Sequence, residues 1–339
     1  MRTILIPLAF VPLSACWPFG APESFTISGE TMGTTYNVTV VDPPRGVDET
    51  TVSAAIEGAL ANVNGKMNNW NPGSEVSQFS ASDSTDPVPA SSEMVTVMAE
   101  ANRINALSGG KFDVTLAPLI NLWGFGPKEP GEPIPSDAEI EAALEHVGQS
   151  TLLTLRDDTL QKALPQVSVN LSAIAKGYGV DAIGGALENE GIARYLVEIG
   201  GDLLAKGQNA EDRPWSIGIE RPDAAQQTVE VIIPVSDLGL ATSGDYRNYF
   251  EEDGIRYSHI IDSTTGRPIT HTTASVTVLA DSAMTADGLA TALLVVGSEE
   301  ALEIAETENV AVMVIDRRDG GFVTSTSPAF DALIAQMEN

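Results

Sequence analysis

The chain has 339 residues, of which 43% are hydrophobic and 19% charged, a composition typical of a folded globular protein and not of a disordered or collagen-like chain. Its net charge of −29 at pH 7 repels phosphate backbones and anionic lipid headgroups, which argues against sequence-independent nucleic-acid binding and against adsorption on a membrane surface. The single cysteine, Cys16, excludes an intramolecular disulfide framework and any zinc or iron–sulfur site built from several cysteines.

The N-terminal segment has the pattern of a bacterial signal peptide. Residues 1–15 combine one arginine with an apolar run that is too short to span a bilayer and is interrupted by two prolines. The run ends in Leu-Ser-Ala-Cys, which resembles a lipobox, where the cysteine is acylated and becomes the new N-terminus. We therefore expect a signal peptide at 1–15, a tether at 16–24 that is lipidated on Cys16, and a folded domain at 25–339. An ordinary cleaved signal with an incidental cysteine is the alternative.

Strand-like and helix-like patterns alternate along the rest of the chain. In the first half of the chain we expect a strand at 34–41, helices over 52–67, 91–107 and 136–147, and a hairpin at 152–164. A short strand at 167–171 should then lead into a helix of small residues that ends near 187. In the second half we expect strands at 195–199, 215–220 and 228–235, a hairpin at 246–261, a strand at 274–279, and helices over 283–296 and from 327 onward. Because strands outnumber helices and many are joined as hairpins, this order favours an α+β fold over a doubly wound parallel sheet. The proline-rich stretch 126–135 is typical of a loop or lid.

One glycine motif imitates a nucleotide-binding fingerprint. Residues 177–182, Gly-Tyr-Gly-Val-Asp-Ala, match G-x-G-x-x-A, the sequence of a Rossmann phosphate-binding turn. That fingerprint places its glycines between a strand and a helix, whereas residues 171–176 here already supply more than one helical turn. We therefore expect these glycines to pack inside a helix.

A carboxylate and a hydroxyl share one face of the helix expected at 283–296. Asp287 and Thr291 are four residues apart, so both side chains project from the same side. Together with a carbonyl from elsewhere they form the kind of hard oxygen site that Mg²⁺ uses. A polar surface pair is the alternative interpretation.

Three histidines are the candidate general bases. His146 lies late in an amphipathic helix, where a surface position is the simplest interpretation, and His271 is expected in a loop. His259 lies in an expected strand close to Asp262, and is either a base or a structural histidine.

A series of short motifs, in this order, closely resembles the ApbE family from about Phe25 to beyond Gly297. The motifs are Thr-Met-Gly-Thr at 31–34, Asn-Asn-Trp at 68–70, Lys-Phe-Asp at 111–113, Ser-x-Ile-x-Lys-Gly at 172–177, Glu-Ile-Gly-Gly-Asp at 198–202, Thr-Ser-Gly-Asp-Tyr-Arg at 242–247, Ser-His-Ile-Ile-Asp at 258–262 and Asp-Gly-Leu-Ala-Thr at 287–291. The family comprises FAD:protein FMN transferases, many of them bacterial lipoproteins, so the expected lipobox agrees with it.

The resemblance implies a fold and a reaction. The fold would be ApbE-like, with mixed, mostly antiparallel sheets packed with helices and an FAD cleft between them. The reaction would be Mg²⁺-dependent transfer of FMN from FAD to a Thr or Ser hydroxyl of an acceptor protein, with release of AMP. Acceptors would be extracytoplasmic subunits of membrane redox complexes of the Nqr or Rnf type, and the protein would be a bacterial membrane lipoprotein on the periplasmic side. The alternatives are an Mg²⁺-dependent FAD pyrophosphatase that yields FMN and AMP, and a non-catalytic flavin-binding lipoprotein.

The resemblance also assigns residues. Asp287 and Thr291 match the metal ligands of the family, Ala173 matches a further ligand that would act through its carbonyl, and His259 matches the base. The residues that match flavin-nucleotide contacts are Met32, Trp70, Lys111, Phe112, Asp113, Asn170, Lys176 and Ile261.

General chemistry agrees with several of these assignments. The flat isoalloxazine ring suits Trp70 or Met32, and Lys176 suits a phosphate as a point charge. A weakly nucleophilic hydroxyl needs a base such as His259, which either Asp262 or Asp245 could orient.

Some of these residues also have simpler interpretations. Trp70 and Trp123 could be core residues, and Asp113 could cap a turn. Two positions depart from the pattern, because Asn170 stands where many members have Asp and Ser263 where many have Pro.

Overall fold

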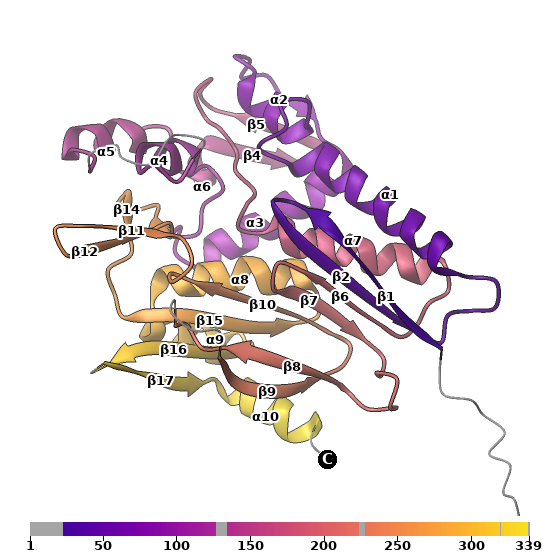
Figure 1. Ribbon diagram of the computed structural model, residues 1–339. Coiled ribbons are helices and arrows are strands. Elements are labelled where there is room, and N and C mark those ends of the chain that lie inside the picture. The colour runs from indigo at the N-terminus through magenta and orange to yellow at the C-terminus, as the bar shows by residue number, and fades with distance from the viewer. Residues whose placement is uncertain (1–22, 127–133, 224–227, 319, 338–339) are drawn as a thin grey trace, which may run out of the picture.

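The computed structural model describes residues 23–126, 134–223, 228–318 and 320–337 (Figure 1). The expected signal peptide, Cys16, most of the tether and most of the proline-rich stretch lie outside these ranges. Within them, no helix combines the length and apolar character needed to cross a membrane.

An eight-stranded sheet, antiparallel throughout, forms the centre of the molecule. Its spatial order is β1 (Ser24–Thr31), β2 (Thr34–Val41), β6 (Tyr195–Ile199), β7 (Asp202–Lys206), β10 (Leu238–Gly244), β15 (Thr273–Ala280), β16 (Ala311–Arg318) and β17 (Gly321–Thr326). Strand β15 is buried almost along its whole length because it lies inside the sheet with packed side chains on both faces.

Four long helices, drawn above the sheet in Figure 1, cover one of its faces. They are α1 (Glu49–Met67), α3 (Ser92–Leu107), α7 (Ala175–Asn189) and α8 (Ala283–Val296). Helix α8 packs directly on β10 and β15, and α7 packs against both α1 and α8. The other face carries the hairpin β8 (Trp215–Glu220) and β9 (Val229–Val235) and helix α10 (Pro328–Met337), while α9 (Ser298–Thr307) connects α8 to β16.

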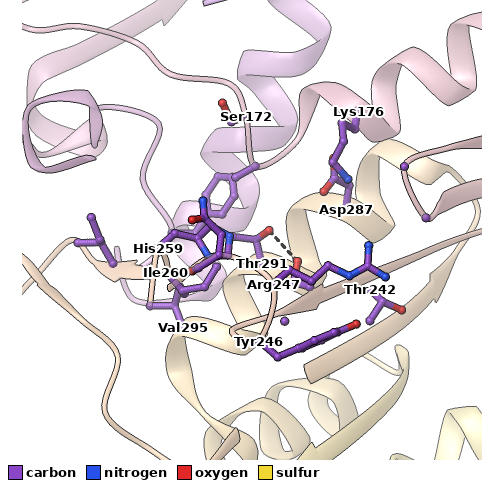
Figure 2. A pocket seen from close by; sticks show the side chains of 18 of the residues that line it. Ser172, Lys176, Thr242, Tyr246, Arg247, His259, Ile260, Asp287, Thr291 and Val295 are labelled. Carbon is purple, nitrogen blue, oxygen red and sulfur yellow. Dashed lines mark hydrogen bonds between the residues drawn. The ribbon is translucent and has the colours of Figure 1, made fainter. Parts of the chain in front are cut away.

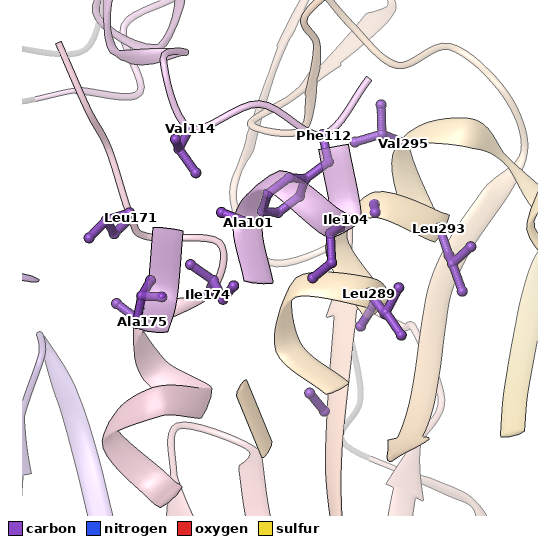
Figure 3. Packing of buried hydrophobic residues seen from close by; sticks show 14 of the residues in the cluster. Ala101, Ile104, Phe112, Val114, Leu171, Ile174, Ala175, Leu289, Leu293 and Val295 are labelled. Atoms are coloured by element: carbon purple, nitrogen blue, oxygen red, sulfur yellow. The ribbon is translucent and has the colours of Figure 1, made fainter. Parts of the chain in front are cut away.

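The largest buried cluster lies between the sheet and helices α3 and α8 (Figure 3). Ile104 of α3, Leu289 of α8, Ile174 and Phe112 are each at most 3% exposed there. Burying a large apolar side chain contributes about 1.5–3 kcal/mol relative to leaving it exposed. This cluster therefore anchors α8, the helix that carries Asp287 and Thr291, on a rigid support.

Smaller elements complete the fold. They are α2 (Glu75–Ala81), β3 (Val88–Pro89), α4 (Ala117–Leu122), α5 (Asp137–Leu144), α6 (Gln149–Leu152), β4 (Leu153–Arg156), β5 (Thr159–Lys162), β11 (Tyr249–Glu252), β12 (Ile255–Ser258), β13 (Ile261–Asp262) and β14 (Arg267–Pro268). The expected α+β class is confirmed, with antiparallel sheets and helices packed on them.

Serine caps begin three of the expected helices. The hydroxyls of Ser91, Ser136 and Ser282 accept hydrogen bonds from the backbone N–H groups three residues later, which would otherwise have no helical partner. Ser136 and Glu139 form a complete capping box.

The prediction of a strand at 167–171 is wrong. Its alternating apolar residues are buried as the pattern suggested, but the backbone pairs with no strand. Instead, the N–H of Val169 donates to Ser80 Oγ at 2.9 Å, that of Asn170 to the Val114 carbonyl at 2.7 Å, and that of Leu171 to Asn69 Oδ1 at 3.0 Å. Two side-chain acceptors and one backbone carbonyl from distant segments thus replace a strand ladder, which no local pattern could indicate.

The glycines of residues 177–182 lie inside α7, as expected. A Cβ at Gly177 would lie 2.2 Å from the Ala283 carbonyl oxygen, and one at Gly179 would lie 3.3 Å from the Met32 side chain. Both glycines therefore permit close packing against α7 and do not form a phosphate-binding turn.

Candidate functional site

A cavity of about 430 Å³ opens between the first turn of α7, helix α8, strands β8 and β10, and the segment after the β11–β12 hairpin. Figure 2 shows Lys176, Arg247, His259, Asp287 and Thr291 around it, although they come from separate parts of the chain. Most of the residues that the sequence predicted for the site line this cavity, namely Lys111, Phe112, Asp113, Asn170, Ala173, Lys176, His259, Ile261, Asp287 and Thr291.

Met32 and Trp70 line a neighbouring cavity of about 510 Å³. The two cavities share Ser172 and Lys176 in their walls, so they adjoin at the first turn of α7. The indole of Trp70 is 68% exposed, which makes it a side chain without a place in the core. A flat exposed ring beside a thioether suits the stacking of an aromatic ligand.

Asp287 and Thr291 face the cavity from consecutive turns of α8, as their spacing predicted. The Asp287 side chain is buried, and its Oδ2 accepts a hydrogen bond of 2.9 Å from the Gly177 N–H in the first turn of α7. The Thr291 hydroxyl lies 3.0 Å from the Ser243 hydroxyl of β10. The carboxylate is thus held between two helices, and the hydroxyl between a helix and the sheet.

Lys176 meets a second buried carboxylate that the sequence analysis did not single out. Its ammonium forms an ion pair with Asp202, the first residue of β7. Burial alone would lower the pKa of Lys176, but the carboxylates of Asp287 and Asp202 outweigh burial and raise it. Burial, reinforced by the Asp287 carboxylate and opposed by Lys176, raises the pKa of Asp202 above its ordinary value. The sequence signal for Asp202 was its place at the end of the motif at 198–202, to which no role was assigned.

His259 follows β12 and is held by a backbone carbonyl. Its Nδ1 lies 2.9 Å from the Asn248 oxygen, and because a carbonyl can only accept, Nδ1 carries the proton and Nε2 keeps a lone pair. Burial lowers the pKa of His259, so the neutral ring dominates at pH 7, although the Asn248 carbonyl and the Asp245 charge oppose this shift. The ring also meets the edge of Phe125, with centroids 6.3 Å apart.

Neither aspartate proposed as an orienting partner forms a described hydrogen bond to His259. Asp245 is engaged by the guanidinium of Arg317 at 2.5 and 2.7 Å. Asp262 accepts a hydrogen bond of 2.8 Å from the backbone N–H of Thr264. The orientation of His259 therefore depends on the Asn248 carbonyl, which sequence reasoning could not identify because every residue has such a group.

The Lys-Phe-Asp motif at 111–113 forms one wall of the cavity and also has structural contacts. Lys111 pairs with Glu300 at 2.8 Å, and Phe112 belongs to the buried cluster below α8. Asp113 accepts hydrogen bonds of 2.6 Å from the N–H groups of Thr115 and Gln149, and burial raises its pKa. The Asp113 carboxylate therefore caps local turns, the simpler of the two interpretations.

The remaining aromatic and histidine candidates lie away from the cavity. Trp123 is buried, stacks on Tyr257 with centroids 5.6 Å apart, and donates from Nε1 to the Gly266 carbonyl at 2.8 Å. His271 reaches the Val295 carbonyl at 3.3 Å, and His146 is half-buried near the end of α5. Trp123 is therefore a core residue.

The donors around Asp287 suit a hard cation. Asp287 offers a carboxylate, Thr291 a hydroxyl and Ala173 a backbone carbonyl, all on the walls of one cavity. Such oxygen donors are those that Mg²⁺ prefers, leaving other positions to water or phosphate. The described ranges hold no cluster of three or more His, Cys, Asp or Glu side chains arranged for a metal ion.

Comparisons with known proteins cover nearly the whole chain. A sequence model described as the ApbE family matches residues 32–314. Proteins named FAD:protein FMN transferase from Vibrio cholerae and Haemophilus influenzae are similar to it. The first is 45% identical over 336 residues, which are 99% of this chain and 100% of that protein, and the second is 46% identical over 320 residues, 92% of each.

Solved structures agree with the sequence comparison. The flavin transferase ApbE from Vibrio cholerae superposes with a TM-score of 0.85 at 44% identity, over 92% of this chain and 99% of that one. The apo form of the Pseudomonas stutzeri flavinyl transferase ApbE superposes with a TM-score of 0.84 at 39% identity, over 92% and 97% of the two chains. The likeness in fold thus extends over almost all of each protein.

Proposed function

The chain belongs to the ApbE family, and we propose that it is an FAD:protein FMN transferase that uses Mg²⁺ and acts as a lipid-anchored protein on the periplasmic side of a bacterial membrane. The transferase activity is that of the relatives named above. The single observation that supports it most is the meeting of Lys176, His259, Asp287 and Thr291 on one cavity. The metal, the anchor and the acceptor are the further parts of the proposal.

Asp287, Thr291 and the Ala173 carbonyl would hold the magnesium ion. Mg²⁺ supplies charge neutralisation for the phosphate oxygens of FAD, which is the main requirement of a phosphoryl transfer. Lys176 adds a point charge at the place where the two cavities adjoin. Trp70 and Met32 offer a surface for the flavin ring in the neighbouring cavity.

His259 would act as the base. The acceptor hydroxyl forms a new bond to the phosphorus of the FMN half of FAD, and the anhydride bond to the AMP phosphate breaks. The hydroxyl proton passes to His259 Nε2, the nitrogen that the Asn248 contact leaves unprotonated. AMP leaves with the electron pair of the broken bond. A base near neutrality typically contributes about 10²–10⁴-fold to such a step.

The acceptor is proposed to be an extracytoplasmic subunit of a membrane redox complex of the Nqr or Rnf type, modified on a Thr or Ser hydroxyl. The expected lipid on Cys16 would keep the enzyme at the same membrane surface as that acceptor. The net charge of −29 supports a lipid anchor over electrostatic adsorption, because an anionic surface repels the protein.

A transfer assay tests this function. Purified protein is mixed with FAD, Mg²⁺ and the extracytoplasmic domain of an Nqr-type acceptor subunit, and intact-mass spectrometry should show the mass of FMN added to the acceptor. Asp287→Ala should reduce the rate on the order of a hundredfold or more, because a metal contributes several kcal/mol to such a reaction.

The matched control is His146→Ala, which changes a half-buried side chain that does not line the cavity and should keep the wild-type rate. Equal rates in the two variants would refute the assignment of Asp287. FMN released without acceptor measures hydrolysis of FAD, and FMN release that acceptor leaves unchanged would indicate a pyrophosphatase instead.

A further inference from the structure

Two buried carboxylates compete for one ammonium at the first turn of α7. Lys176 forms its ion pair with Asp202, whose side chain is only 2% exposed, and it also feels the charge of the buried Asp287. Figure 2 shows the Lys176 side chain above Asp287 at the edge of the cavity. The next residue, Gly177, donates its N–H to Asp287 Oδ2, so the lysine stem begins beside this carboxylate. A flexible four-carbon stem allows the ammonium to reach either carboxylate.

An ammonium at Asp287 would exclude other cations from it. A carboxylate that already pairs with a lysine offers less attraction to a divalent ion, since the two positive charges repel each other at short distance. Arg247, another cation whose charge acts on Lys176, is held by Glu220. Asp202 is therefore the group that decides whether Lys176 occupies Asp287.

We propose that Asp202 is a positioning residue that holds the Lys176 ammonium away from Asp287 and so keeps the Asp287 carboxylate available to a divalent cation. The inference rests on the proposed function, because it assumes that Asp287 binds the metal. It adds to that function a residue that acts through Lys176 and not by ligating the ion itself.

The backbone before Asp202 fixes its carboxylate in place. Gly200 and Gly201 form the turn between β6 and β7 with φ values of 55° and 99°, a left-handed region that glycine adopts without strain. The Gly201 N–H donates to Glu198 Oε1 at 2.7 Å, and Asp202 pairs with Ile199 at the start of the strand ladder. Because the turn and the ladder hold the backbone, the short Asp202 side chain stays beside Lys176.

Metal binding in four proteins tests the inference without relying on catalysis. Mn²⁺ is titrated into the wild type, Asp202→Asn, Lys176→Met and the double variant, and free Mn²⁺ is followed by its paramagnetic resonance signal. Asp202→Asn should weaken Mn²⁺ binding about tenfold, since Lys176 then turns to Asp287. The double variant should recover to within about threefold of Lys176→Met, because the competing ammonium is gone.

The matched control is Asp316→Asn, which alters a buried aspartate that accepts from Thr273 and lies outside the cavity, and it should leave Mn²⁺ binding unchanged. Urea unfolding checks that each variant folds. If Asp202→Asn does not fold, the test depends on Lys176→Met alone. This variant should bind Mn²⁺ at least as tightly as the wild type does.

Several outcomes would overturn the inference. They are unchanged binding in Asp202→Asn, no recovery in the double variant, weaker binding in Lys176→Met, or no Mn²⁺ binding by the wild type. Flavin transfer, measured separately on the wild type with FAD, Mg²⁺ and the acceptor domain, judges the proposed function. A failure of the positioning role is thus distinguished from a failure of the activity.

Discussion

At His259 one backbone contact decides which ring nitrogen is basic. The Asn248 carbonyl accepts a hydrogen bond from Nδ1–H, and burial keeps the ring neutral, so Nε2 can accept a proton at physiological pH. The sequence placed His259 correctly on the cavity, because its motif resembles a known set. Its orienting partner is a main-chain group, and the two aspartates that the sequence suggested are engaged elsewhere.

The pH dependence of transfer should follow from this contact. Because burial lowers the pKa of His259 below 6.5, kcat/KM should be constant near pH 7 and fall as the pH drops through that lower pKa, where the ring becomes protonated and cannot accept the hydroxyl proton. A pH–rate profile of the wild type measures this limb. His259→Gln should lose about 10²–10⁴-fold in rate together with the limb, whereas His146→Gln should keep both. An unaltered profile in His259→Gln would remove the histidine from the mechanism.

At the scale of elements, α7 and α8 cap each other. Asp181 of α7 accepts hydrogen bonds of 2.8 and 2.9 Å from the N–H groups of Ala283 and Met284, which begin α8, and Asp287 of α8 accepts from Gly177 in the first turn of α7. The periodicity of apolar residues predicted α8 with the bounds that the structure has, and α1 and α3 within a few residues. The pairing of the caps could not be predicted, because it depends on how closely two helices approach.

Gly177 makes that approach possible, which can be tested by unfolding. A Cβ there would lie 2.2 Å from the Ala283 carbonyl oxygen, so Gly177→Ala must push the helices apart and should destabilise the protein by about 1–3 kcal/mol in urea unfolding. Gly185→Ala is the matched control on the same helix, since it is exposed and a Cβ there would meet nothing within 4 Å. It should raise the stability by about 0.5–1 kcal/mol. Destabilisation of the same size in both variants would contradict this account of the packing.

At the scale of the whole molecule, distant parts of the chain build one site. Asp202 begins β7, which lies next to β10 in the sheet, and α7 packs on β7, so Asp202 contacts Lys176. This strand order depends on pairing between segments that are far apart in the sequence. The sequence therefore predicted the α+β class, and most of the site residues that it proposed lie on the cavity, but it predicted neither the strand order nor the role of the second carboxylate. The segment at 167–171 shows the same limit, because side chains from residues 69 and 80 pair with its backbone.

The proposed lipid anchor concerns the whole molecule and can be tested in cells. Cys16→Ser should remove the site of lipidation, so the protein should move from the membrane pellet to the soluble extracytoplasmic fraction, with flavin transfer to a soluble acceptor domain unchanged. Fractionation followed by intact-mass spectrometry measures both the location and the acyl groups. Ser24→Thr, a conservative change of an exposed residue outside the Leu-Ser-Ala-Cys motif, is the control. A Cys16→Ser protein that stays in the membrane fraction would refute the lipid anchor.

The two cavities share a wall at Ser172 and Lys176. The length of a ligand therefore affects the strength of the charge interactions at this junction. A short molecule that fills one chamber leaves water at the junction, where the high dielectric constant weakens every charge pair. A molecule long enough to occupy both cavities displaces that water and strengthens the attraction between Lys176 and a phosphate beside it. We therefore expect a ligand that fills both cavities to gain more from its contact with Lys176 than a ligand that fills only one.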